Sequence, residues 1–200
     1  MDTTKIIVAL LGAGGLFTAI FAFLKWYLPW RLSRKNKRGA LQGLESLNTI
    51  YQVLHDVIKN TNATRIIIFA GHNSGKIPRA GSPYYTSAIH WRSEGEEAGK
   101  DVIDISSYRN IAVDGFYISI LLKCYDRGFI KLNTESMEEC QLKKYYLAEG
   151  VTEAYIYFLG FVEANFMYMC IANRGTPFTD VNTAVMGLAA SRVANEINKG

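Results

Sequence analysis

The chain has 200 residues, a formal net charge of +4 and 49% hydrophobic residues. Residues 1–38 hold seven Lys and Arg against one Asp, whereas the rest of the chain holds fifteen against seventeen Asp and Glu. The positive charge is therefore confined to the N-terminal part, which excludes a basic nucleic-acid-binding face on the main body.

After a short tail of residues 1–5, an uncharged apolar run of nineteen residues extends from Ile6 to Leu24. At about 1.5 Å per residue it spans roughly 28 Å, which is close to the hydrocarbon thickness of a bilayer. Aromatic residues typical of a membrane–water interface follow at Trp26, Tyr27 and Trp30. The pattern predicts a single-pass transmembrane helix over residues 6–30. A cleaved signal peptide would begin with basic residues, whereas the basic cluster of this chain follows the apolar run. A buried core helix of this length would have a polar face, and this run has none.

A basic juxtamembrane collar covers residues 31–38. Its charged residues are Arg31, Arg34, Lys35, Lys37 and Arg38. The positive-inside rule places this side of the membrane in the cytoplasm, so we expect an inner-membrane protein whose C-terminal domain, residues 39–200, is cytoplasmic. The collar either binds anionic lipid headgroups or only sets the topology.

The stretch from Gly39 to Asn60 has the pattern of an amphipathic helix. Apolar residues alternate at spacings of three and four, at Leu44, Leu47, Tyr51, Leu54 and Ile58. This seam packs either on the core of the domain or on the same helix of a second chain, which would give a parallel homodimer.

Five runs predict strands or extended segments, because β-branched and aromatic residues lie between turn formers. They are residues 64–70, 83–91, 129–132, 153–162 and 166–172, with a further extended stretch expected at 101–107. Residues 64–91 form a long hairpin, with a loop at 92–100 after it. Residues 163–165 are the turn of a second hairpin.

Three further helices are predicted from periodicity and capping residues. They cover residues 113–125, closed by Gly128, residues 137–149, and a last helix that begins at Thr179 or Asp180 and ends near Lys199. The order of elements predicts an α+β domain on one central antiparallel sheet, with the N- and C-terminal helices together on one face.

The part of the chain from Tyr125 to Asn195 resembles the GAF domain, a sensory module related to PAS. The resemblance lies in YDRGFIKLNTESMEE, in LKKYYLAEGVTEAYIYFL and in ANRGTPFTDVNTAVMGLAASRVANEI. The helix before TRIIIFAG fits the opening of the family. The Asn-Lys and Phe-Asp-Glu signature of the cyclic-nucleotide-binding subset and the ligating Cys of the photosensory subset are not found here, so the resemblance implies a fold and a pocket but leaves the ligand and any cofactor unknown.

The resemblance places a ligand pocket between the sheet and residues 105–149. Polar residues there, with two from the sheet, are candidates for orienting a small molecule: Tyr85, Arg109, Asn133, Thr134, Glu135, Tyr145 and Tyr157. The alternative is that they cap helices and cover the core.

Catalytic and metal-binding patterns are weak. His55, His72 and His90 have no Cys or carboxylate at metal-ligand spacing, and we expect His72 to be the most accessible polar group of a turn. We expect Glu135, Glu138 and Glu139 to form a solvated face. The three cysteines have no CxxC spacing and fit free thiols in a reducing compartment, with Cys140 alone exposed.

The leading hypothesis is a non-enzymatic, membrane-anchored GAF-like sensory or regulatory module. It would bind a small ligand or a protein partner, dimerise through its end helices, and be read by an output protein in trans. One alternative is a membrane-tethered scaffold without a ligand, which predicts an occluded pocket. Another is a sulfoxide reductase on the same fold, which would need a reactive cysteine, with Cys140 the candidate.

Overall fold

The computed structural model describes residues 23, 25, 28–73, 77–94 and 105–199, with the backbone alone for 28–36 and 38. The chain divides into two compact units, Met1–Glu45 and Ser46–Gly200. Helix α2 (Leu28–Asn60) begins in the first unit and ends in the second.

Helix α2 starts at Leu28, eleven positions before the predicted start at Gly39, so the collar is helical. Pro29 is compatible with this start because the first helical turn needs no backbone N–H donor there, and the basic residues that follow are good helix formers. Lys37 is exposed. Trp30, Arg31, Arg34, Lys35 and Arg38 are described by their backbone alone.

Within the described part of the chain, no helix is both long and apolar enough for a membrane crossing. The predicted span Ile6–Leu24 lies outside the described residues except for Phe23, as do the interfacial residues Trp26 and Tyr27. The transmembrane helix therefore stays a prediction.

The second unit is built on one antiparallel sheet of six strands, in the order β3-β2-β1-β6-β5-β4. The strands are β1 (Arg65–His72), β2 (Tyr85–Ser93), β3 (Ile111–Ala112), β4 (Phe129–Asn133), β5 (Glu153–Val162) and β6 (Asn165–Asn173). The two predicted hairpins and the α+β class are confirmed. The two-residue strand β3 was not predicted, because so short a run carries no periodicity.

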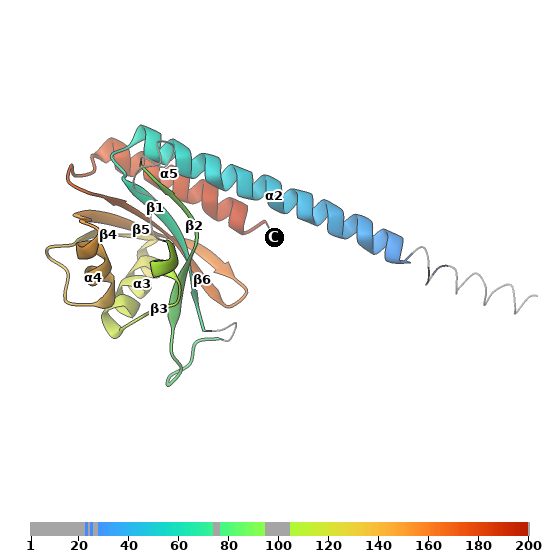
Figure 1. The fold of residues 1–200 in the computed structure, drawn as a ribbon, viewed down its shortest axis with the longest axis horizontal. Coiled ribbons are helices and arrows are strands. Elements are labelled where there is room, and N and C mark those ends of the chain that lie inside the picture. Colours follow the sequence, from blue (N-terminus) through green and yellow to red (C-terminus); the bar gives the residue numbers. More distant parts are fainter. Residues whose placement is uncertain (1–22, 24, 26–27, 74–76, 95–104, 200) are drawn as a thin grey trace, which may run out of the picture. The chain divides into compact units, whose positions relative to one another are not determined.

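Alternate residues of the central strands pack on opposite faces of the sheet. Ile66 and Ile68 of β1 face a core with Leu54 of α2 and Val193 of α5, helix Asp180–Ile197. Ile67 and Phe69 face a second core with the other helices. Figure 1 shows α5 and the C-terminal part of α2 side by side over one face, as the sequence predicts, with α3 and α4 over the other.

On this second face lie α3 (Gly115–Arg127), α4 (Gln141–Ala148) and the short 3-10 helix η3 (Ile105–Tyr108). Gly128 ends α3 with φ 79°, as predicted. Two predictions were wrong. The described residues of 101–107 are helical rather than extended, and α4 starts at Gln141 rather than Met137, because Asn133 and Cys140 cap local turns with their side chains.

Candidate functional site

A buried arginine lies between the sheet and the helices of the second face. Arg65, the first residue of β1, is 2% exposed. Its guanidinium contacts the Tyr108 hydroxyl of η3 and the Glu149 carboxylate that follows α4. The same group lies 5.5 Å from the ring centroids of Tyr108 and Tyr146. The buried charge is thus compensated by one carboxylate and two aromatic faces.

Tyrosine hydroxyls extend this interior cluster across the sheet. Tyr168 of β6 shares hydrogen bonds with Tyr117 of α3, at 2.6 Å, and with Thr86 of β2, at 2.7 Å. The Tyr146 hydroxyl lies 3.2 Å from the sulfur of Cys170. These bonds link α3 to β6 and β2, and α4 to β6.

Burial sets the charge state of this network. It raises the pKa of Tyr117, and it raises the pKa values of Tyr146 and Tyr168 well above their usual value. It also raises the pKa of the Cys170 thiol, and it lowers the pKa of Arg65. The hydroxyls and the thiol are therefore neutral near pH 7, so the cluster suits packing and hydrogen bonding rather than nucleophilic chemistry.

Little space remains inside the cluster. The cavity among Arg65, Tyr145, Tyr168 and their neighbours has a volume of about 10 Å³. A cavity of that size holds one water molecule at most. A metabolite could enter only if side chains of η3 or α4 moved away.

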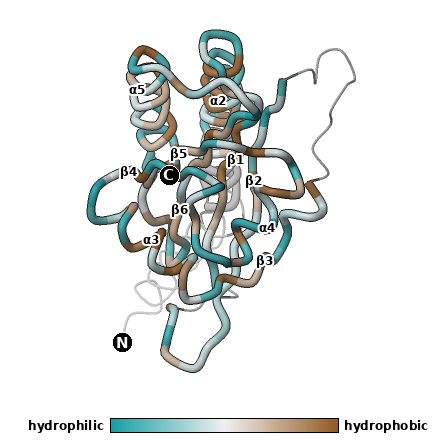
Figure 2. The backbone as a smooth tube through the Cα atoms, turned by 90° about the vertical axis from the view of Figure 1, so that its left-hand side faces the viewer, coloured by the Kyte–Doolittle hydropathy of each residue, from teal (hydrophilic) through white to brown (hydrophobic). Residues whose placement is uncertain are grey.

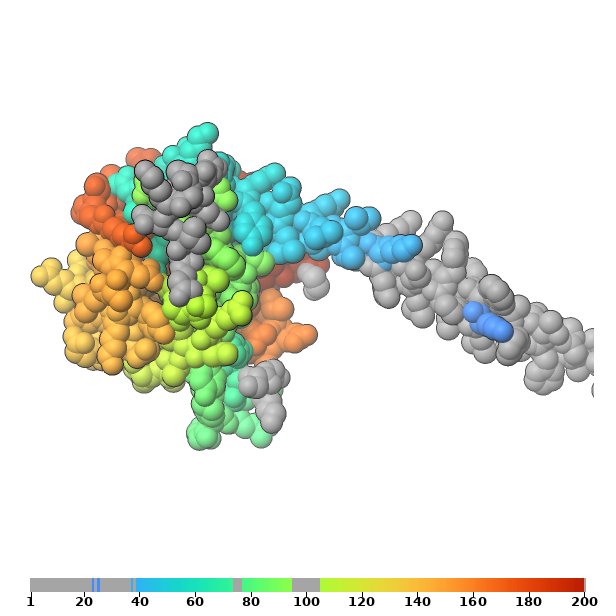
Figure 3. All heavy atoms as spheres, in the orientation of Figure 1, coloured from blue at the N-terminus to red at the C-terminus, as the bar shows by residue number. Residues whose placement is uncertain are grey.

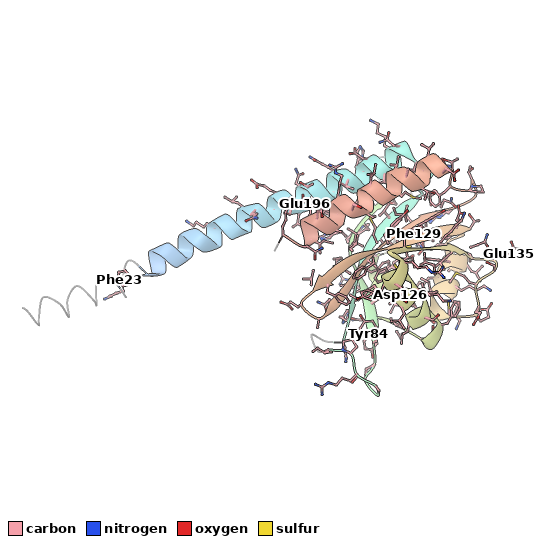
Figure 4. All side chains as sticks on the ribbon, turned by 180° about the vertical axis from the view of Figure 1, so that it is seen from behind. Phe23, Tyr84, Asp126, Phe129, Glu135 and Glu196 are labelled. Atoms are coloured by element: carbon pink, nitrogen blue, oxygen red, sulfur yellow. The ribbon has the colours of Figure 1, made fainter. Side chains whose placement is uncertain are left out.

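The structure does not bring the seven predicted ligand residues together. Tyr145 alone lines the interior cavity. Arg109, Asn133 and Glu135 are exposed, and Glu135 points outward at the edge of the domain in Figure 4. Their role in ligand binding stays a prediction.

The other three candidates lie at separate places. Thr134 is buried beside the loop before α4, and Tyr157 is buried on the opposite face of the sheet. Tyr85 is half-buried on β2, with its ring 6.3 Å from the ring of His72. Asn133 accepts the backbone N–H of Glu135, so it serves as a turn cap.

Sequence reasoning missed Arg65, Tyr108, Tyr117 and Tyr168. One signal was available for Arg65, because a charged residue at the inward-facing start of an apolar strand needs a partner. No local pattern identifies the tyrosines, because their partners lie 43 to 82 residues away in the chain.

A second hollow is apolar and lies along α3 between Ile118 and Tyr125. This apolar groove has a volume of about 660 Å³. Its walls are α3, residues 78–84 of the β1–β2 loop, and the turn between β5 and β6. The lining residues are Pro78, Arg79, Ala80, Gly81, Ser82, Tyr84, Ile118, Leu121, Leu122, Tyr125, Phe161, Ala164 and Phe166.

The three cysteines are free and buried, so the predicted exposure of Cys140 was wrong. Cys140 caps α4, where its sulfur accepts the backbone N–H of Lys143 at 3.4 Å. Burial raises the pKa of Cys140 and raises that of Cys124 to about 12. A reactive thiolate is thus disfavoured at all three positions. Among the described residues, no group of three or more His, Cys, Asp and Glu could hold a metal ion.

The histidines have structural neighbours. His72 ends β1 rather than lying in the turn, and its Nε2 lies 3.0 Å from the Ser87 hydroxyl. His90 packs edge-on against Tyr51 of α2, with ring centroids 5.5 Å apart, and burial lowers its pKa. His55 lies on α2. Glu135, Glu138 and Glu139 are all exposed, as predicted.

The predicted seam of α2 divides into two parts. Leu54 is fully buried, and Ile58 packs on the core beneath α2 and α5. Leu44, Leu47 and Tyr51 are 63%, 36% and 42% exposed. The stripe that covers the sheet is instead Ile50, Val53, Leu54 and Val57, and it leaves the N-terminal part of the seam open.

Comparison with solved structures identifies the fold. The chain is similar to the PixJ GAF domain of Thermosynechococcus elongatus in its blue-light absorbing form, with a TM-score of 0.54, 9% identity, and 79% of this chain and 88% of that one covered. The chain is also similar to a GAF domain/HD domain protein from Geobacter sulfurreducens, with a TM-score of 0.51 and 12% identity. The match covers 75% of this chain and 90% of that one.

A third similar structure is the GAF domain of a two-component sensor histidine kinase from Bacillus halodurans, with a TM-score of 0.51 and 12% identity. The match covers 76% of this chain and 92% of that one. No protein-family model and no curated protein matches the sequence. The likeness therefore establishes a GAF fold, as the sequence resemblance implied, and leaves the function to the chain's own residues.

Proposed function

We propose that this chain is a non-enzymatic regulatory module, a GAF-fold domain held at the inner face of the cell membrane by residues 6–30. In this proposal two copies associate along α2, and an output protein in trans reads how their helices pack. The fold is that of the sensor proteins named above, which supports a sensory role.

One observation carries the proposal. Helix α2 exposes Leu44, Leu47 and Tyr51 while the neighbouring stripe, from Ile50 to Val57, packs on the sheet. An apolar stripe open to solvent next to a buried one is the pattern of a helix that packs on two surfaces at once. A second copy of α2 is the partner that matches its own spacing.

The closed interior favours a protein partner over a small ligand that binds within the Arg65 cluster. With about 10 Å³ free around Arg65, a ligand must first displace Tyr108 or Tyr145. This observation also favours the ligand-free membrane scaffold as a second candidate, because that function requires an occluded pocket.

Disulfide cross-linking in native membranes tests the dimer. The Leu47→Cys variant of the full chain should form a covalent dimer on mild oxidation, because equivalent positions of a parallel pair face each other. The Gln42→Cys variant is the matched control, since Gln42 is exposed on the opposite side of α2. The native thiols are buried, which keeps the background low. Equal cross-linking of both variants would refute the seam.

Thermal unfolding of the full chain with a panel of cyclic nucleotides and small metabolites distinguishes a small-ligand input from a protein-partner input. A raised midpoint with one compound would support a ligand sensor whose interior opens. No change with any compound, together with a cross-linked dimer, would favour the docking module or scaffold.

A further inference from the structure

The apolar groove is separate from the interior cluster and has no part in the proposed dimer. It lies where α3, the β1–β2 loop and the β5–β6 turn meet. Figure 3 shows residues 77–84 of the β1–β2 loop, in green, projecting from the body of the domain, and Figure 2 shows them below α3. Its volume of about 660 Å³ lies within the range of small-molecule sites.

Large apolar side chains line this groove and remain accessible. Leu122 and Tyr125 of α3 are 58% and 52% exposed, and Phe161 of β5 is 53% exposed. Side chains of this kind gathered in one concavity, rather than scattered singly, indicate a surface that is covered by an apolar occupant.

Gly71 of β1 lies next to the Tyr84 ring. A Cβ atom on Gly71 would lie 2.6 Å from the Tyr84 hydroxyl oxygen, so a side chain at residue 71 would require the Tyr84 ring to shift. Figure 4 shows Tyr84 where the β1–β2 loop joins the sheet. Burial raises the pKa of Tyr84, which keeps its hydroxyl neutral.

The charge in the groove is confined to one place. Among the described residues that line it, Arg79 alone is charged, and it lies on the exposed loop that forms one wall. A guanidinium pairs with a carboxylate through two parallel hydrogen bonds. An occupant that matches this lining has a long apolar body and a single anionic end.

We propose that the apolar groove binds a long-chain fatty acid, with the acyl chain against α3 and the β5–β6 turn and the carboxylate at Arg79. The groove suits one flexible chain better than a folded partner, because it is a hollow between three segments rather than a flat face. Binding here would give the domain an input that does not require the interior to open.

Photo-cross-linking of the full chain in lipid nanodiscs tests this proposal. The probe is palmitate with a diazirine near the end of its chain, and the labelled peptides are identified by mass spectrometry. We expect label on the α3 peptide, residues 115–127. The Leu122→Asp variant should lose about fivefold or more of that label, because it places a charge in the apolar lining.

Leu147→Asp is the matched control, since Leu147 lies on α4 and is exposed by the same 58% as Leu122. This variant should keep the label. The corresponding diazirine alcohol and a diazirine lysophosphatidate test the headgroup. The palmitate probe should label the α3 peptide more strongly than the alcohol or the lysophosphatidate probe. In the Arg79→Ala variant, the palmitate and alcohol probes should label this peptide equally.

Label on the α3 peptide that is equal in Leu122→Asp and Leu147→Asp would overturn the site. Stronger labelling by the alcohol or the phosphate would overturn the carboxylate assignment. Neither result depends on whether α2 dimerises, so the outcome is independent of the cross-linking at Leu47.

Discussion

At the scale of single residues, the buried ion pair of Arg65 and Glu149 is a point where one substitution should destabilise the domain. The guanidinium is 2% exposed and the Glu149 side chain 20% exposed. Glu149→Leu leaves the arginine charge buried without its carboxylate, so we expect a loss of about 3 kcal/mol in the free energy of unfolding. Urea titration of the full chain in mild detergent measures this loss.

The double variant Arg65→Met, Glu149→Leu removes both charges and should recover most of that loss. Costs that simply add in the double variant would show that the pair contributes nothing as a pair.

Glu153 makes the stability of the domain depend on pH. Its carboxylate pairs with Lys131 and accepts the backbone N–H of Phe178 at 2.8 Å. Burial alone would raise its pKa, but these two contacts outweigh burial, and the pKa lies below the ordinary 4.5. The contribution of Glu153 to stability is therefore complete above pH 4.5 and is lost as the pH falls through the pKa of the folded state.

Unfolding measured between pH 7 and pH 3 checks this expectation. Glu153→Gln should destabilise the domain by about 1–3 kcal/mol at pH 7 and flatten its acid dependence. Glu135→Gln, a change at an exposed site, is the control and should leave the profile of the native chain. An unaltered acid dependence in Glu153→Gln would assign the acid sensitivity to other groups.

At the scale of the elements, one carboxylate caps two helices. Asp114 accepts the backbone N–H of Tyr117 in α3 at 2.8 Å and that of Gln141 in α4 at 2.7 Å. We expect Asp114→Ala to cost about 2–3 kcal/mol, because two charge-assisted bonds are lost. Thr179→Ala, which removes the cap of α5 alone, should cost about 1 kcal/mol. Equal costs in chemical unfolding would contradict the double cap.

The buried stripe of α2 should contribute to the stability of the domain, and its exposed stripe should contribute to dimer formation. Leu54 is fully buried, so Leu54→Ala should cost about 2–5 kcal/mol of stability. Leu47 is 36% exposed, so Leu47→Ala should cost less than about 1 kcal/mol and weaken the dimer instead. Unfolding titrations and sedimentation in detergent measure the two effects. A large stability loss in Leu47→Ala would place that residue in the core.

At the scale of the whole molecule, attachment to the membrane is the expectation with the widest consequences. Leu11→Arg would place a charge within the apolar run, so we expect a shift of the chain from the carbonate-resistant membrane fraction to the soluble fraction. Leu188→Arg on the exposed side of α5 is the control and should stay in the membrane. Membrane retention that is unaltered by Leu11→Arg would refute the anchor.

The sequence by itself determined the α+β class, the two hairpins, the start of the last helix at Thr179 or Asp180, and the αL end of α3 at Gly128. These features follow from local periodicity and capping, which need only neighbouring residues. The resemblance to GAF domains gave the fold, which the solved structures confirm.

The tertiary structure alone decided which residues meet inside. It buried Cys140, filled the expected pocket with tyrosines, separated the seven candidate ligand residues, and opened the apolar groove instead. The physical reason is that a cavity depends on how side chains from distant strands and helices fill the space between layers. Arg65, Tyr146 and Cys170 come from three elements, and no local pattern records their contact.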